Sequence, residues 1–156
     1  MERLRRLGLC TLILLFCACQ HTKDSSYEYF EVVGESGWQT EDEYFFSSSD
    51  LKPITPYSVS IVLRIKQDIK YEAIPLGITL ESPKRCFETY VLNVNLQKSS
   101  SLFKDNGYNY KELVVPLQKD TYFPDEGVYT YSIRHLSTDS IVRGIIEVGL
   151  IIHPNK

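Results

Sequence analysis

Residues 57–66 read YSVSIVLRIK, the clearest alternation of apolar and polar side chains in the chain. One row of this stretch is apolar and holds Tyr57, Val59, Ile61, Leu63 and Ile65. The other row is mostly polar and holds Ser58, Ser60, Val62, Arg64 and Lys66. A period of two is typical of a β-strand with one buried side and one solvent-facing side. The stretch therefore predicts a half-buried strand.

The same alternation recurs along the rest of the chain. Clear strands are predicted at residues 90–96, 129–134 and 145–152, and weaker ones at 27–33, 43–47, 73–80 and 108–115. Pro116 is expected to stop the strand before it, and Pro154 to end the last one. No window of a dozen residues has helical periodicity. About eight short strands predict an all-β fold, an antiparallel two-sheet β-sandwich, of which a jelly roll is one form.

Composition limits the class of protein. The 156 residues are 43% hydrophobic and 24% charged, which is ordinary for one globular domain and excludes wholesale disorder. The net charge of −3 argues against nucleic-acid binding, because such proteins carry a concentrated excess of Lys and Arg. We therefore expect no nucleic-acid partner.

The N-terminus has the pattern of an export signal. Three arginines within residues 1–6 precede an apolar run at residues 7–16. This run is about half as long as the roughly 20 residues that a membrane-spanning helix needs. Small Ala18 before Cys19 resembles a bacterial lipobox, in which a thiol takes diacylglycerol as a thioether. The pattern predicts a lipoprotein signal peptide at residues 1–18.

Lipidation of Cys19 sets the expected domain organisation. Polar residues follow it, so we expect a lipidated cysteine and flexible tether at residues 19–26 and one β-sandwich domain at 27–156. Acyl chains on Cys19 would hold the protein on a membrane. Cys86 is then the one cysteine of the domain, expected in the core or near the surface without a disulfide. The alternatives are a conventional signal peptide cut nearby or a tail buried in the membrane.

No catalytic or metal-binding pattern stands out. His21, His135 and His153 lack the spacing of metal ligands, and each is predicted to be a solvated or edge residue. The acidic residues Glu41, Asp42 and Glu43 lack the alternating spacing of calcium loops, and a loop leading into a strand explains them. There is no glycine-rich phosphate loop. We therefore expect no enzyme activity, no metal and no cofactor.

Trp38 is the one candidate for ligand or partner contact. An exposed indole ring between Gly37 and Gln39 could stack on a sugar, because an aromatic face offers apolar area with a polar handle. The alternative, which we favour, is that the ring packs against the core of the sandwich.

Several segments match a known family in the same order. They are Cys19 after a short signal, Gly37-Trp38 before the acidic cluster, residues 44–46, 57–64, Tyr71, 127–129, 132–133 and IVRGIIEVGL at 141–150. The chain thereby resembles the GldH family of gliding motility lipoproteins from Bacteroidetes, whose closing segment is Gly-Ile-x-x-Val-Gly-Leu. The resemblance implies a cell-envelope lipoprotein that supports surface movement or a linked secretion apparatus, with no known catalytic residues.

These observations lead to one favoured function and to alternatives. The favoured function is that of a non-enzymatic accessory lipoprotein, anchored through Cys19 to the outer membrane and contacting other envelope proteins. Whether it faces the periplasm or the cell surface stays open. The first alternative is a glycan-binding β-sandwich lipoprotein, suggested by the eleven tyrosines, by Trp38 and by the use of jelly rolls for sugars. A hydrolase using Glu41, Asp42 or Glu43 ranks third.

Overall fold

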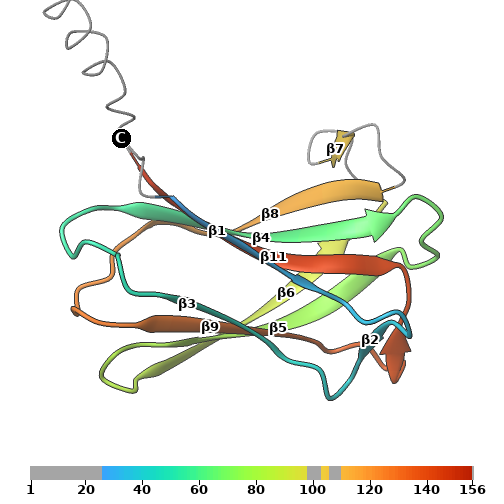
Figure 1. The fold of residues 1–156 in the computed structure, drawn as a ribbon, viewed down its shortest axis with the longest axis horizontal. Coiled ribbons are helices and arrows are strands. Elements are labelled where there is room, and N and C mark those ends of the chain that lie inside the picture. The colour runs from blue at the N-terminus through green and yellow to red at the C-terminus, as the bar shows by residue number, and fades with distance from the viewer. Residues whose placement is uncertain (1–25, 98–102, 106–109, 156) are drawn as a thin grey trace, which may run out of the picture.

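The computed structural model describes residues 26–97, 103–105 and 110–155. The predicted signal peptide at residues 1–18, Cys19 and most of the predicted tether at 19–26 therefore lie outside the described residues. Every regular element in the described ranges is a β-strand, which confirms the all-β prediction (Figure 1). Within those ranges no helix has the length and apolar content of a membrane span.

Eleven strands form in the described part of the chain. They are β1 (Tyr27–Val32), β2 (Trp38–Gln39), β3 (Tyr44–Ser48), β4 (Tyr57–Lys66), β5 (Ala73–Glu81), β6 (Phe87–Asn95), β7 (Phe103–Asp105), β8 (Tyr110–Thr121), β9 (Tyr129–His135), β10 (Ile141–Val142) and β11 (Ile145–Pro154). Three of them, β2, β7 and β10, have only two or three residues. The remaining eight strands correspond to the eight that the alternation predicts.

The long strands form two antiparallel sheets that face each other (Figure 1). The five-stranded sheet has the order β1-β11-β4-β8-β7, and the four-stranded sheet has the order β3-β9-β5-β6. Successive long strands alternate between the sheets, except that β5 and β6 form a hairpin within the four-stranded sheet. This connectivity is that of a jelly roll. The predicted two-sheet antiparallel sandwich is therefore confirmed in its jelly-roll form.

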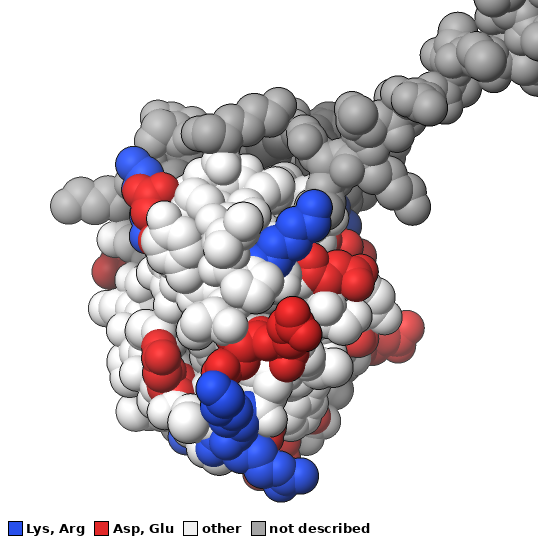
Figure 2. Space-filling model, turned by 90° about the vertical axis from the view of Figure 1, so that its left-hand side faces the viewer, with Lys and Arg blue, Asp and Glu red and all other residues white. Residues whose placement is uncertain are grey.

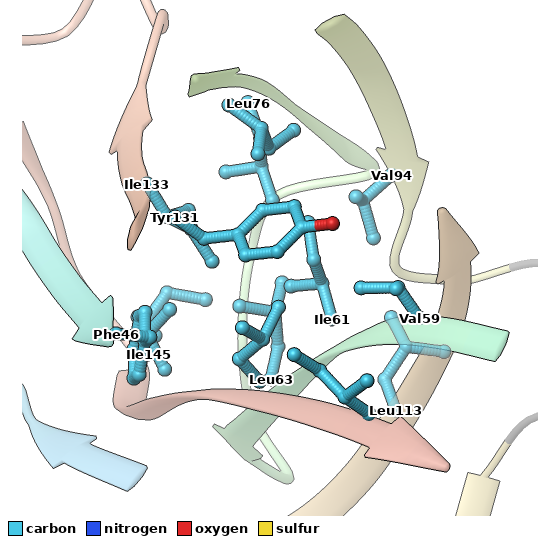
Figure 3. Close-up of a cluster of buried hydrophobic side chains, with 14 of the residues drawn as sticks. Phe46, Val59, Ile61, Leu63, Leu76, Val94, Leu113, Tyr131, Ile133 and Ile145 are labelled. Carbon is cyan, nitrogen blue, oxygen red and sulfur yellow. The ribbon is translucent and has the colours of Figure 1, made fainter. Parts of the chain in front are cut away.

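The core lies between the two sheets. The apolar row of β4 points into it, and each of its five side chains is at most 1% exposed. Figure 3 shows Tyr131 reaching from β9 into the same space, close to Ile61 and Leu76. Burying such a side chain contributes roughly 1.5–3 kcal/mol relative to leaving it exposed. The alternation seen in the sequence is therefore the packing of one sheet against the other.

Two predicted strand boundaries are wrong, because the strand expected at residues 90–96 already begins as β6 at Phe87 and another strand runs past its expected end. The strand expected to stop before Pro116 continues as β8 to Thr121. Pro116 lies opposite Ser60, and the register between β4 and β8 shifts beside this pair, as it does at a β-bulge. Within the described residues, β7 covers the other edge of β8 only at Lys111–Leu113. Pro116 therefore stands beside a register shift, at a position where no described strand pairs with the other edge of β8, and bulges and edges are where proline occurs in sheets.

The two ends of the sandwich carry different loops. The end where β1 begins at Tyr27, called the tether end below, also carries the loops at residues 49–56, 82–86 and 122–128. The opposite end, called the far end, carries the segments at residues 33–43, 67–72 and 136–144. Figure 1 shows the tether end at the left and the far end at the right.

A chain of polar side chains links the two sheets near the core. The Tyr131 hydroxyl of β9 donates to Oε1 of Gln118 on β8 at 2.7 Å. Nε2 of Gln118 donates to the Tyr90 hydroxyl of β6 at 2.8 Å, and that hydroxyl donates to Glu88. Burial, together with Glu88, raises the pKa of Tyr90 to about 12. Burial also raises the pKa of Tyr131 well above its usual value.

Replacing Tyr131 with Phe should destabilise the fold and weaken its response to alkaline pH. Oε1 of the partly buried Gln118 would lose its donor, and the loss of such a hydrogen bond costs about 1 kcal/mol. In the native chain the unfolded tyrosines lose protons near their ordinary pKa of 10.0, whereas the folded Tyr90 and Tyr131 hold theirs to higher pH. Unfolding stability should therefore fall as pH rises above 10. In urea unfolding at about pH 8 to 11, Tyr131→Phe should have a lower midpoint than the native chain. Its midpoint should also fall less steeply as the pH rises.

Tyr122→Phe is the matched control for this experiment. The Tyr122 side chain is 56% exposed, so its midpoint should stay close to that of the native chain. Equal midpoints and equal pH dependence in Tyr131→Phe and Tyr122→Phe would contradict a stabilising role for the polar chain.

Candidate functional site

Trp38 lies in the core at the far end. It is 0% exposed and pairs with Val142 in the small β2–β10 ladder. Its ring packs against those of Tyr44 and His135, with centroids 5.4 and 5.5 Å away. The indole Nε1 donates to the backbone carbonyl of Asp42 at 3.0 Å. The structure thus places Trp38 in the core, the alternative that the sequence favoured, with no ring face open to a sugar.

The acidic residues 41–43 belong to a loop that leads into β3. Oδ2 of Asp42 accepts a hydrogen bond from the backbone N–H of Gln39 at 3.0 Å, which holds the turn after β2. Glu41 and Glu43 are exposed. Among the described residues no three His, Cys, Asp or Glu side chains come together as a metal-binding group.

His135 corrects a prediction. The sequence predicts a solvated or edge residue, but the His135 side chain is 1% exposed and lies on β9, between β3 and β5. It continues the inward row of Tyr129, Tyr131 and Ile133, so its position in the alternation already indicated burial. Both ring nitrogens are buried without a hydrogen-bond partner in the described part of the chain. The imidazole therefore acts as a core ring beside Trp38.

The other sequence candidates do not gather at one place. His153 is exposed near the end of β11, and His21 lies outside the described residues. Cys86 is a free, exposed thiol in the turn between β5 and β6, in agreement with a position near the surface. Residues 34–37 form a turn, in which the N–H of Gly37 donates to the carbonyl of Gly34 at 2.9 Å.

A cluster of charges lies on the outer face of the five-stranded sheet. Nε of Arg64 on β4 is 3.0 Å from Oε2 of Glu112 on β8, and its terminal nitrogen also pairs with Glu147 on β11. The Phe30 ring covers the guanidinium, with its centroid 4.0 Å from Cζ. It can lie there because Gly149 has no side chain: a Cβ would fall 2.5 Å from Phe30 Cδ1. Arg64 pairs with both carboxylates, so this cluster links β4 to its two neighbouring strands.

One candidate site is an open depression at the far end, called the far-end basin below. Its volume is about 550 Å³. It is lined by Lys66, Asp68, Ile69, Lys70, Tyr71, Asp139, Arg143 and Gly144. These residues come from the end of β4, the loop after it, and the segments on either side of β10. A second depression of about 440 Å³ shares Lys66, Arg143 and Gly144 and extends toward the turn after β1.

Two backbone contacts hold the basin together. The N–H of Lys66 donates to the carbonyl of Gly144 at 2.7 Å, which joins the end of β4 to the turn between β10 and β11. Gly144 has φ +97°, and a Cβ there would fall 3.0 Å from Cγ1 of Ile69. Glycine is therefore required both by the backbone conformation and by the close approach of the neighbouring loop.

Tyr71 fastens the loop after β4 to the segment before β10. Its hydroxyl donates to Oδ2 of Asp139 at 3.1 Å and lies 3.4 Å from the carbonyl oxygen of Ile141. Burial and the Asp139 carboxylate raise the pKa of Tyr71, which keeps the hydroxyl protonated as a donor.

The charges of the basin suit a polar, partly anionic partner group. Lys66, Lys70 and Arg143 are exposed and cationic, whereas Asp68 and Asp139 are the two acidic side chains of its lining. Asp139 already accepts the Tyr71 hydroxyl. Amines and a guanidinium can bind carboxylate or other anionic oxygens. The basin has the features of a contact site and lacks a paired nucleophile and base.

Sequence reasoning did not predict the basin. Lys66 was placed only on the solvent-facing row of its strand, and Tyr71 and Arg143 appeared only as parts of the family resemblance. The sequence feature that could have pointed to the basin is that these family segments, although distant in sequence, contain many charged residues and glycines. Their meeting depends on the order of the strands.

Replacing Gly144 with Ala should destabilise the far end. A non-glycine residue held at positive φ costs of order 1–3 kcal/mol, and the new Cβ would also press on Ile69. Gly34→Ala is the matched control, because a Cβ there meets only the Ser36 hydroxyl, at 3.9 Å. Urea unfolding should show a lower midpoint for Gly144→Ala and a nearly native one for Gly34→Ala. Equal midpoints would contradict this account of the turn.

Comparisons with solved structures give distant likenesses. The chain is similar to a carbohydrate-binding module specific for non-crystalline cellulose, with a TM-score of 0.41 and 12% identity over 84% of this chain and 73% of the module. It is also similar to a 4-O-methyl-α-glucuronidase with specificity for decorated arabinogalactans, with a TM-score of 0.41 and 13% identity over 82% of this chain and 16% of the enzyme.

Comparisons of sequence give a closer relation. No curated protein matches the chain. A model of the GldH lipoprotein family, however, matches residues 25–152, which include the described strands almost to the end of β11. The match covers both sheets and the far-end basin. The chain therefore belongs to the GldH lipoprotein family.

Proposed function

We propose that this protein is a non-enzymatic accessory lipoprotein of a gliding-motility or linked secretion apparatus, anchored to the outer membrane through Cys19. The observation that carries the proposal is the family match over residues 25–152. The lipobox pattern supplies the expected site of acylation, and two or three acyl chains hold a protein stably on a membrane. The protein's contacts with the apparatus are then made by the sandwich domain.

The geometry supports a role in which the far end meets partner proteins. The expected anchor precedes Tyr27, at the tether end. A ten-residue strand such as β4 spans about 33 Å, at 3.3–3.4 Å per residue, so the far-end basin lies about that far from the tether end. Exposed Lys66, Lys70 and Arg143 are therefore directed away from the anchor, where other envelope proteins can reach them.

Replacing Cys19 with Ala should release the protein from membranes. The variant lacks the thiol that forms the thioether, so it should appear in the soluble periplasmic fraction without acyl mass. Globomycin, which blocks the lipoprotein signal peptidase, should prevent maturation of the native chain. Intact-mass measurement and membrane fractionation check both results, and surface spreading and protein secretion in the native host check the accessory role.

Cys86→Ala is the matched control, because this thiol is exposed in the folded domain and is not preceded by a signal. It should leave acylation and fractionation unchanged. Native protein that stays membrane-bound without acyl mass would overturn the anchor. Normal spreading and secretion by cells lacking the protein would overturn the accessory role.

A second candidate function is glycan binding, which the outer face of the four-stranded sheet favours. Phe45 on β3 is 59% exposed and begins a row across the sheet that continues through Ser132 and Thr79 to Thr89. An exposed aromatic ring beside hydroxyls can stack on a sugar while the hydroxyls bind its oxygens. With Trp38 in the core, Phe45 is an exposed ring on this face that such stacking could use, and Phe87 of β6 on the same sheet is a second one, 63% exposed.

Replacing Phe45 with Ala tests this second function. If the face binds glycans, the native protein should bind members of a polysaccharide array and Phe45→Ala should reduce that binding at least tenfold. Val32→Ala, another exposed apolar residue on the other sheet, should bind as the native protein does. An array on which the native protein binds nothing would contradict the glycan-binding function.

A further inference from the structure

The tether end carries large apolar side chains in solvent. Ile54 is 90% exposed, Tyr122 is 56% exposed and Val128 is 52% exposed. Ile54 lies in the loop between β3 and β4, and the other two lie in the loop between β8 and β9. Figure 2 faces this end and shows an uncharged area bordered by both acidic and basic side chains. Such an end is suited to apolar contact more than to attraction of one sign of charge.

Ile54 stands at the tip of a fixed turn. The N–H of Thr55 donates to the carbonyl of Lys52 at 3.1 Å, which closes a four-residue turn with Pro53 and Ile54 in the middle. The N–H of Lys52 in turn donates to the hydroxyl of Tyr57, a buried residue of β4, at 2.9 Å. Tips of turns usually carry glycine or small polar residues. Here a branched apolar side chain is held outward on a loop tied to the core.

The loop between β8 and β9 is held by the same part of the core. Phe123 is 1% exposed, and its ring centroid lies 5.6 Å from that of Tyr57 and 4.9 Å from that of Tyr129. The N–H of Asp125 donates to the Tyr129 hydroxyl at 2.9 Å. Both loops are therefore ordered before any partner arrives, so contact through their apolar side chains requires little further ordering.

The length of chain before β1 limits what these loops can meet. Residues 20–26 separate Cys19 from Tyr27, and seven residues span at most about 25 Å when fully extended. A flexible coil of seven residues spans about 15 Å on average. Tyr27 starts at the same end as both loops. Acyl chains on Cys19 would thus keep this end, rather than the far end, within reach of the lipid surface.

We propose that the tether end docks on the membrane surface, with Ile54 inserted among the lipid acyl chains and Tyr122 at the interfacial level. This inference rests on the proposed lipidation of Cys19. A branched apolar side chain gains by leaving water, and a tyrosine ring with its hydroxyl suits the boundary between lipid and water. The docked domain stands upright on the bilayer and holds the far-end basin away from it.

Tryptophan quenching in the full lipidated chain tests the docking. Ile54→Trp would be reconstituted into phosphatidylethanolamine and phosphatidylglycerol vesicles whose acyl chains carry bromine, a contact quencher. The chain has one native tryptophan, Trp38, which is buried and gives a constant background. The fluorescence that Ile54→Trp adds to this background should be quenched several-fold more strongly than the fluorescence that Val32→Trp adds. Val32 is the matched control because it is 69% exposed and ends β1 at the far end.

A second tryptophan position shows whether the result at position 54 reflects docking or only a local change in structure caused by that substitution. Val128→Trp places the probe on the other loop of the tether end and should also be quenched more strongly than Val32→Trp. If both variants float with the vesicles but are quenched no more than Val32→Trp, the docking is wrong and the anchor stands. Shielding of position 54 from iodide in native envelope fragments, without quenching in vesicles, would assign this end to a protein partner and also overturn the docking.

Lipidation of Cys19 is measured separately from docking. Flotation of the native chain with vesicles and the acyl mass on residue 19 report lipidation, whatever the quenching shows. A native chain without acyl mass that fails to float would overturn the proposed anchor, and the docking with it.

Discussion

The structure depends on the packing of the apolar row of β4 against the four-stranded sheet. β4 pairs with β11 on one side and β8 on the other, so it is the central strand of the five-stranded sheet. Its inward side chains, from Tyr57 to Ile65, are almost wholly buried. A slip of one residue would turn this row outward and bring Ser58, Ser60 and Arg64 into the core. The register of β4 therefore sets the register of both neighbouring strands and the face on which Arg64, Glu112 and Glu147 lie.

The outer face of the same strand shows the second consequence of that register. Arg64 lies between Glu112 of β8 and Glu147 of β11, and the ring of Phe30 on β1 covers it. Four strands that are distant in sequence thus meet around one guanidinium. The last strand, β11, also lies between β1 and β4, so the sheet is completed only when the end of the chain inserts between earlier strands. Such non-local pairing is typical of jelly rolls and of slowly folding β proteins.

The connections of the jelly roll sort the loops into two groups with different chemistry. The tether end carries apolar side chains on loops that are tied to the buried rings of Tyr57, Phe123 and Tyr129. The far end carries cations and a tyrosine around glycine turns that join the end of β4 to the segments beside β10. In the proposed arrangement, the first group meets lipid and the second meets proteins of the envelope, and the sandwich separates them by the length of a strand.

The sequence by itself determined the all-β class, the positions of the eight long strands and the family, because the alternation of side chains is a local consequence of the pleated backbone. It also contained the burial of His135, which continues the row of Tyr131 and Ile133, although spacing rules for metal ligands led to the wrong prediction. Only the tertiary structure decided that β8 passes through Pro116, because this required a register shift beside the Ser60–Pro116 pair at an edge with which no described strand pairs. Only the tertiary structure brought Lys66, Tyr71 and Arg143 to one basin and Ile54 and Tyr122 to the opposite end. The physical reason is that strand order and loop placement follow from which sheets pack together, and that packing depends on contacts between residues far apart in the chain.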